Sequence, residues 1–286
     1  MATILVDGVA YGMLLFVLAC GLSVTLGVMN FINLAHGAFA MAGGYVAVAL
    51  ANRHGAPLAA ALAAAFIVPA LAGAVLERTL YRRVYGRSHL DQVLFTVGLV
   101  FMSVAAVDYF MGSSQVFVHL PPSLEGQFEL GGVRIGRYRA LIVALCGVIA
   151  FGLQYVLART RFGSRLRASV DDPRTARGLG INVNRVFTLT FAVGSGLAGL
   201  GGALGAEILG LDPHFPLKFM IYFLIVVAVG GTSTVTGPLA AAILLGIGDV
   251  AGKYYLPQFG AFAIYSIMIA MLVWRPRGLL ARSNGK

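Results

Sequence analysis

The strongest constraint on the fold of this chain is a series of apolar segments, each about long enough to cross a lipid bilayer, that recurs from one end to the other. A transmembrane helix needs about 20 mostly apolar residues. Such segments lie at residues 5–28, 31–50, 57–76, 93–111, 140–157, 186–204, 215–229, 238–250 and 262–274. The polar stretches between them leave no room for a soluble domain. We therefore expect residues 1–286 to form a single transmembrane domain.

The composition agrees with a membrane protein. Of 286 residues, 59% are hydrophobic and 11% are charged, whereas soluble domains contain about 45–50% apolar and about 25% charged residues. The seventh and eighth segments are short, so they form either two tilted spans with a tight turn or one re-entrant or broken pair. We expect an all-α, polytopic integral membrane protein with eight or nine transmembrane or re-entrant helical segments.

The basic residues indicate how the segments are oriented. Fifteen of the 21 Lys and Arg residues fall in three clusters, at residues 78–87, 159–185 and 275–286. Cytoplasmic loops carry an excess of Lys and Arg, and an odd number of crossings places all three clusters on one side. The N-terminus should therefore face outwards and the C-terminus should face the cytoplasm. The formal charge of +10 then reflects topology and contact with anionic membrane lipid, and it indicates no nucleic-acid partner.

The second apolar segment, within MNFINLAHGAFAMAGGYVAVAL, carries polar side chains and little bulk in its first turns. Asn33 and His36 are three residues apart and would share one face of a helix. Polar groups inside a membrane are costly and indicate a functional site, so this face is a candidate lining for a solute path. The candidate residues are Asn30, Asn33, His36 and Gly37. Alternatively, Asn30 and Asn33 cap the helix and His36 bonds a neighbouring carbonyl; the two interpretations are compatible.

A second polar stretch, GGTSTVTG at residues 230–237, separates the seventh and eighth segments. Its hydroxyl groups and glycines would allow an irregular turn that lines the path, as broken helices do in transporters. An ordinary turn between helices is the alternative. The path candidates here are Thr232, Ser233 and Thr234.

Asp249 is the one carboxylate well inside a late segment. A lone charge near the centre of the membrane would cost about 2.5–3.5 kcal/mol on insertion scales. We therefore expect Asp249 to face a cavity, to pair with Lys253 one turn further on, or to lie nearer the membrane surface.

The longest polar connection is ARTRFGSRLRASVDDPRTARGLGINVNRV, residues 158–186. Asp172 followed by Pro173 is typical of a helix N-cap and first turn. One further turn would follow, and Gly178 or Gly180 would supply the left-handed stop. The pattern predicts a short helix parallel to the membrane that can dock to a partner. The alternative is a solvated, positively charged loop.

Several catalytic patterns are missing from the sequence. No Gly-x-x-x-x-Gly-Lys-Ser/Thr loop is present to hold a nucleotide phosphate, so we expect the chain not to hydrolyse ATP itself. No group of His, Cys, Asp and Glu residues has metal-ligand spacing. We therefore expect a protein that is not an enzyme, with no catalytic residue, metal or cofactor.

Four stretches together resemble one known family. They are NFINLAHGAFAMAGGYVA, RASVDDPRTARGLGINVNRV, VVAVGGTSTVTGPLAAAILLGI and WRPRGLL. In this order they resemble the inner-membrane permease subunit of bacterial ABC importers for branched-chain amino acids, the H-type subunit of a permease heterodimer. The resemblance covers nearly the whole chain.

The resemblance implies a multi-pass protein of the bacterial inner membrane that works with a second homologous permease subunit, two cytoplasmic ATPase subunits and a periplasmic solute-binding protein. It also implies that the loop at about residues 159–185 docks into the ATPase. The residues that would take part are Asp171, Asp172, Pro173, Arg174, Thr175, Arg177, Gly178, Gly180 and Asn182. Members of the family also serve urea, short amides and aromatic acids, so the solute stays open between these and a branched-chain or related amino acid.

Two other classes of protein are the alternatives. A secondary transporter would also have glycine-rich spans, but it would need a coupling-ion site, typically of intramembrane carboxylates, whereas most acids here lie at segment ends. An intramembrane hydrolase would need a nucleophile such as Ser195 with His36 as its base. Gly-x-Ser-x-Gly spacing is absent around Ser195 and no orienting acid is evident. Co-purification with an ATPase subunit would separate the three classes.

Overall fold

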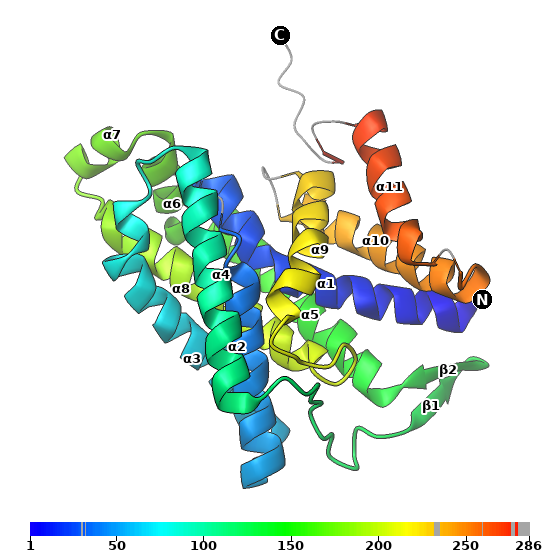
Figure 1. Cartoon of the computed structure of the whole chain (residues 1–286). Helices are drawn as coiled ribbons and strands as arrows, with labels where there is room; N and C mark the ends of the chain where they lie inside the picture. The colour runs from blue at the N-terminus through cyan, green and yellow to red at the C-terminus, as the bar shows by residue number, and fades with distance from the viewer. Residues whose placement is uncertain (30, 32, 232–234, 259, 276–277, 280–286) are drawn as a thin grey trace.

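The computed structural model describes residues 1–29, 31, 33–231, 235–258, 260–275 and 278–279. Within these residues the chain is mainly helical, with one small sheet (Figure 1). The helices are α1 (Ala2–Met29), α2 (His36–Val48), α3 (Leu58–Thr79), α4 (His89–Met111), α5 (Arg137–Arg159), α6 (Arg161–Asp171), α7 (Pro173–Gly178), α8 (Val183–Gly205), α9 (Phe215–Gly230), α10 (Thr236–Tyr255) and α11 (Gly260–Trp274). A π-helical turn, Ala49–Arg53, extends α2, and a 3-10 turn, Tyr81–Arg83, follows α3.

Five of the described helices are long and apolar enough to cross a membrane, namely α1, α3, α4, α5 and α8. Two shorter apolar helices, α9 and α11, accompany them. Most of α1 and α8 is buried inside the chain, whereas only a small share of α3, α4 and α5 is buried. The chain is therefore a polytopic membrane protein in which α1 and α8 form the centre and α3, α4 and α5 present apolar surface outwards.

Small residues allow the central helices to approach closely, as the glycine content of the spans suggests. A Cβ atom added to Gly12 of α1 would lie 2.6 Å from the Ala242 carbonyl oxygen of α10. A Cβ atom on Gly43 of α2 would meet the backbone of Gly199 in α8 even more closely. The α1–α10 and α2–α8 contacts therefore depend on backbone-to-backbone packing, and side chains at these positions would separate the helices.

The second helix is shorter than the sequence indicates. An apolar segment was expected over residues 31–50, but α2 begins at His36, after a turn. Asn33 therefore lies before the helix, and its side-chain oxygen accepts a hydrogen bond from the Tyr81 hydroxyl instead of capping α2. The expectation that Asn33 and His36 share a helix face is wrong for this reason.

The expected all-α fold is wrong in one connection. Strands β1 (Gln127–Leu130) and β2 (Val133–Gly136) form an antiparallel hairpin between α4 and α5. The two residues between them, Gly131 and Gly132, have φ angles of 58° and 79°. Two consecutive residues with positive φ form the tight turn that matches the twist of a hairpin, and Gly-Gly is a favoured sequence for it.

The late helices α9 and α10 are separate elements that pack against each other. Helix α10 is longer than the expected segment at residues 238–250 and packs along α1. Its last turns include Asp249 and Lys253, whose side chains form an ion pair of 2.6 Å. This pair is one of the arrangements expected for Asp249, and it lets the helix continue beyond its apolar part.

Candidate functional site

Helix α7 lies in the long basic connection and is capped as the sequence predicts. One carboxylate oxygen of Asp172 accepts hydrogen bonds from the backbone N–H groups of Arg174 (2.9 Å) and Thr175 (3.1 Å), and the other accepts from the Thr175 hydroxyl (2.5 Å). Pro173 occupies the first turn, and Gly180 has a φ of 80° just beyond the helix. The predicted short helix is therefore present, and Gly180, not Gly178, has the left-handed conformation.

The electrostatics of this cap favour a charged carboxylate. The hydrogen bond from the Thr175 hydroxyl and those from the backbone N–H groups of Thr175 and Arg174 lower the pKa of Asp172 below its ordinary value. Each of these donors stabilises the ionised form. The helix is therefore capped by a full negative charge at neutral pH.

The surface of α7 is almost fully accessible. Only Ala176 is buried between residues 171 and 180, and Leu179 is 74% exposed. Figure 1 shows α6 and α7 together at one side of the molecule, far from the N-terminus. The structure thus brings the expected coupling residues into one protruding segment, which we call the α7 knob. These residues are Asp171, Asp172, Pro173, Arg174, Thr175, Arg177, Gly178, Gly180 and Asn182.

A second helix supports the α7 knob, and sequence reasoning missed it. Helix α6 fills residues that were expected to be loop, and the Thr160 hydroxyl caps it by accepting from the Gly163 N–H at 3.4 Å. Gly163, Leu166 and Ser169 are buried and recur every three residues along α6. This spacing is typical of one buried face of a helix. Helix α6 contacts α5, α7 and α8, so the knob stands on a folded base.

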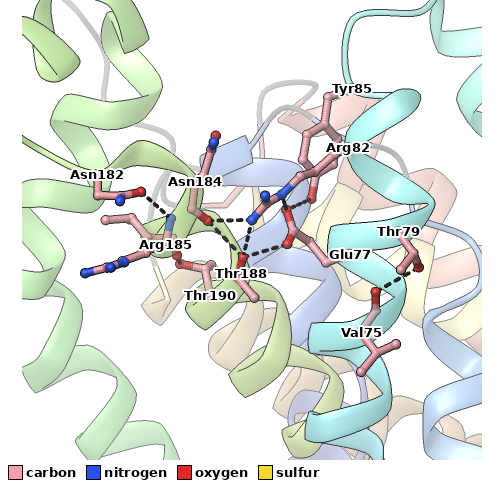
Figure 2. Close-up of polar contacts among 11 residues, drawn as sticks. Val75, Glu77, Thr79, Arg82, Tyr85, Asn182, Asn184, Arg185, Thr188 and Thr190 are labelled. Atoms are coloured by element: carbon pink, nitrogen blue, oxygen red, sulfur yellow. Dashed lines mark hydrogen bonds and ion pairs between the residues drawn. The ribbon is translucent and has the colours of Figure 1, made fainter.

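A buried carboxylate at the end of α3 bonds to α8, the helix that follows the α7 knob (Figure 2). Glu77, at the end of α3, is fully buried and forms an ion pair of 3.0 Å with Arg82. The Thr188 hydroxyl of α8 donates to the second carboxylate oxygen at 2.6 Å, and the Tyr85 hydroxyl donates to the first at 3.3 Å. Arg82 also donates to the Asn184 carbonyl at 3.2 Å. Buried charges are stable only when paired and hydrogen-bonded in this way.

Glu77, Arg82, Tyr85 and Thr188 form a group that we call the Glu77 cluster. The α7 knob is directly connected to it. Asn182 ends the knob segment and also caps α8, because its side-chain oxygen accepts from the Arg185 N–H at 3.0 Å. The next turns of α8 carry Asn184 and Thr188, which bond to Arg82 and Glu77. The end of the α7 knob is therefore connected to α8 within two turns of the bonds that join α8 to the end of α3.

The expected path residues before and within α2 are deeply buried in the single chain. Asn33 is 1% exposed and His36 is 2% exposed. Asn33 contacts Tyr81, and the His36 ring lies edge-on to Phe223 at 6.5 Å between centroids. The Asn33 side-chain nitrogen and His36 Nε2 have no hydrogen-bond partner among the described residues. Two buried polar atoms therefore lack a partner within the described part of the chain, and such atoms in a buried site need an explanation.

Gly37 and the remaining expected path residues are placed differently. A Cβ atom on Gly37 would lie 2.9 Å from the Pro216 Cα atom, so this glycine permits the start of α2 to contact the start of α9. Four path candidates lie outside the described residues: Asn30, Thr232, Ser233 and Thr234. Among the residues that are described, no group of three or more His, Cys, Asp or Glu side chains is arranged to hold a metal ion.

Comparison with known proteins gives a consistent result. Residues 4–273 match the family model described as the branched-chain amino acid transport system permease component. The chain is 29% identical to the high-affinity branched-chain amino acid transport system permease protein BraD of Pseudomonas aeruginosa, over 97% of this chain and 95% of that protein. It is 26% identical to LivH of Escherichia coli K12, over 96% of this chain and 94% of that protein.

A second type of permease is also similar. The permease protein LivM of the high-affinity branched-chain amino acid transport system of Escherichia coli K12 is 28% identical, over 49% of this chain and 33% of that protein. No solved structure matches the chain.

Proposed function

This chain belongs to the family of permease components of branched-chain amino acid transport systems, and we propose that it is the H-type permease subunit of an ABC importer in a bacterial inner membrane. In this proposal it forms the path for a small polar solute together with a second, homologous permease. Two cytoplasmic ATPase subunits drive the transport, and a periplasmic solute-binding protein delivers the solute. The similarity to both LivH and LivM supports a pair of related permeases.

The observation that carries this proposal is the α7 knob. A helix of six residues is too short to be stable by itself, yet it has a complete cap, a proline in its first turn and a left-handed stop. Almost all of its side chains are exposed. A capped, exposed protrusion that presents Arg174 and Arg177 is suited to a cleft with acidic groups on a partner, since charges of opposite sign determine register and association rate.

The Glu77 cluster supports the mechanical part of the proposal. An ATPase that pushes on the α7 knob would displace the first turns of α8. In these turns Thr188 bonds to Glu77 of α3. Helix α8 is largely buried at the centre of the chain. A shift of α8 would therefore alter the packing of α1, α2 and α3, all of which contact it.

The path is proposed to include Asn33, His36 and Gly37, together with Asn30, Thr232, Ser233 and Thr234. Support comes from Asn33 Nδ2 and His36 Nε2, which have no hydrogen-bond partner among the described residues and would gain one when water or solute enters between the helices. In the conformation described here the Asn33 and His36 side chains are buried, so the neighbouring helices would have to separate for a solute to reach them. The solute is proposed to be a branched-chain or related amino acid.

Co-expression of the chain with its neighbouring genes tests this function. We expect the tagged permease to be purified with a second permease and with ATPase subunits, and ATP hydrolysis to rise when loaded binding protein is added. A chain that catalyses solute uptake in proteoliposomes without any ATPase would be a secondary transporter, and the proposal would be wrong.

A further inference from the structure

A cavity far from the α7 knob combines two ion pairs with aromatic surface. It has a volume of about 350 Å³ and lies between the start of α1, the start of α5, α9 and the end of α10. The C-terminal end of α5 leads directly into α6, so the cavity and the knob lie at opposite ends of α5. In the orientation that the basic clusters predict, this cavity faces the outside of the cell.

Four charged side chains line the cavity, two of each sign. Asp7 of α1 forms an ion pair with Arg139 of α5, and Lys253 of α10 pairs with Asp249 at 2.6 Å. The lining therefore carries no net charge, yet it has separate positive and negative groups. A solute that carries both charges can pair with both kinds of group. A solute with a single charge would leave the groups of its own sign without a partner.

Asp249 is the least satisfied of these groups. Its side chain is 1% exposed, and its second carboxylate oxygen has no hydrogen-bond partner among the described residues. A buried carboxylate with one free oxygen is costly. An ammonium group entering the cavity would supply the missing donor. Lys253, by contrast, is 53% exposed and can move without loss of burial.

The rest of the lining is largely apolar. It includes the rings of Tyr11, Phe219 and Tyr222 and the side chains of Ile208 and Val250. Small-molecule sites typically have volumes of about 300–1,000 Å³ and mostly apolar walls with a few placed polar groups. The cavity matches this description in volume and chemistry.

We propose that this cavity is an outer binding site for a zwitterionic amino acid with an apolar side chain. The solute's ammonium group bonds to Asp249, its carboxylate is held by Lys253 and Arg139, and its side chain lies against the aromatic rings. The site rests on the proposed function, because it receives the solute before the path opens. A phosphatidylethanolamine headgroup carries the same two charges and is the competing occupant that the experiment must separate.

The test uses the assembled complex in vesicles of phosphatidylcholine and phosphatidylglycerol, which contain no primary amine. Val250→Cys places a thiol in the cavity lining, and Leu256→Cys places one at the same end of α10 on a residue that is 61% exposed and is not part of the lining. The native Cys20 and Cys146 are 1% and 0% exposed and give little background. The rate of labelling with a membrane-impermeant thiol reagent is measured with and without L-leucine.

L-Leucine should slow labelling of Val250→Cys about tenfold at about ten times its dissociation constant, because only the empty site reacts. Isocaproate, which lacks the ammonium group, and isoamylamine, which lacks the carboxylate, should not protect. Leu256→Cys should react at the same rate in all samples. Equal protection by isoamylamine and leucine would overturn the proposal, because the site would then recognise a cation only.

Variants that neutralise Asp249 and Lys253 show whether Asp249 binds the solute or only pairs with Lys253. In the Val250→Cys background, Asp249→Asn should abolish protection by leucine, and the double variant Asp249→Asn with Lys253→Met should remain unprotected. If the double variant regains protection, Asp249 serves only to neutralise Lys253 and the proposal is wrong. Slow labelling without leucine in phosphatidylethanolamine vesicles would assign the cavity to lipid and would also overturn it.

The same preparations distinguish this inference from the proposed function. ATPase subunits are assayed in each complex before labelling. A complex that retains its ATPase but shows no protection by leucine contradicts the binding site alone. A chain that never assembles with an ATPase contradicts the proposed function, whatever leucine does to the labelling rate.

Discussion

Thr188 of α8 donates a hydrogen bond of 2.6 Å to Glu77 of α3, a residue 111 positions earlier in the chain. Thr188 also accepts a hydrogen bond from Arg82 at 2.7 Å. The pair joins two apolar helices through a buried carboxylate, six residues after Asn182, which ends the α7 knob and caps the start of α8 (Figure 2). We infer that this bond holds α8 in place when the knob is pushed.

Thr188→Val should therefore weaken both the fold and the coupling. The substitution keeps the shape of the side chain but leaves Glu77 without one donor, which typically costs about 1–3 kcal/mol for a buried group. Stability is measured by denaturant unfolding of the purified permease, and coupling by the stimulation of ATP hydrolysis by loaded binding protein. Both should fall.

Thr190→Val is the matched control for this substitution. Thr188 and Thr190 are both 3% exposed, but among the described residues the Thr190 hydroxyl donates within its own helix, to the Val186 carbonyl at 2.8 Å. Its loss removes no contact between helices. Equal effects of the two substitutions on stimulation would contradict the role assigned to the Glu77 bond.

The orientation of the chain predicts a specific labelling pattern. Cysteines introduced at Arg83 and at Ser164, both exposed, should react only with reagent from the cytoplasmic side. A cysteine at Gln127 of the β-hairpin, also exposed, should react only from the outside. The measurement compares intact cells with inverted membrane vesicles. Labelling of Ser164→Cys in intact cells by an impermeant reagent would reverse the proposed orientation.

The Asp172 cap predicts a graded response to substitution. Asn retains an acceptor oxygen for the backbone N–H groups but loses the charge, whereas Ala loses both. Asp172→Ala should therefore lower the amount of ATPase that remains bound more than Asp172→Asn does. Retention is measured by quantifying both subunits after affinity purification. Equal loss in the two variants would show that the charge, and not the cap, is recognised.

The same cap sets the pH dependence of the knob. The folded pKa of Asp172 is lowered, so its contribution to stability is fully present above the ordinary carboxyl pKa of about 3.9. It is lost as the pH falls through the lower folded value. ATPase retention by the wild-type knob should therefore be constant from neutral pH down to the ordinary carboxyl range, measured by affinity purification at each pH. A decline that begins near neutral pH and is absent in Asp172→Asn would contradict this assignment.

The unpartnered atoms of Asn33 and His36 predict a transport defect without loss of assembly. Asn33→Leu or His36→Leu should lower solute uptake, since the path loses a hydrogen-bonding group, while the complex and its basal ATP hydrolysis persist. Tyr81→Phe removes the donor to Asn33 without changing the proposed path groups and serves as the control. Loss of assembled complex in the leucine variants would show that these residues serve packing only.

Features encoded by neighbouring residues could be predicted from the sequence. The N-cap at Asp172, the proline after it and the glycine stop at Gly180 lie within nine residues, and the structure confirms the helix they predict. The hairpin could have been found in the same way, because Gly131 and Gly132 lie between two alternating stretches. It was missed because the apolar segments dominate the pattern around it.

Features that depend on distant residues could not be predicted in this way. Nothing local to Glu77 indicates that Thr188 will be its partner, and nothing local to Asn33 indicates that Tyr81 will take its side-chain oxygen and leave the helix to start at His36. Asp249 lies between these cases. Its partner Lys253 is one turn away and was foreseen, but the cavity beside it is formed by four helices.

Reversal of charge on the α7 knob tests the central claim, that this chain is a permease that docks an ATPase through α7. Arg174 and Arg177 lie three residues apart, share one helix face and are exposed. Changing both to Glu should reduce bound ATPase about tenfold or more, because attraction becomes repulsion at a buried contact. Insertion into the membrane and pairing with the second permease should persist.

The matched control reverses Arg161 and Arg165 of α6, which are exposed and lie outside the knob, with the same change in net charge. The measurement is the ratio of ATPase to permease after affinity purification, together with solute uptake. ATPase and uptake should be lost in the α7 variant, and both should be retained in the α6 variant. Normal uptake with ATPase still bound in the Arg174→Glu, Arg177→Glu variant would contradict it and would direct the search for the docking site to the basic cluster at residues 78–87.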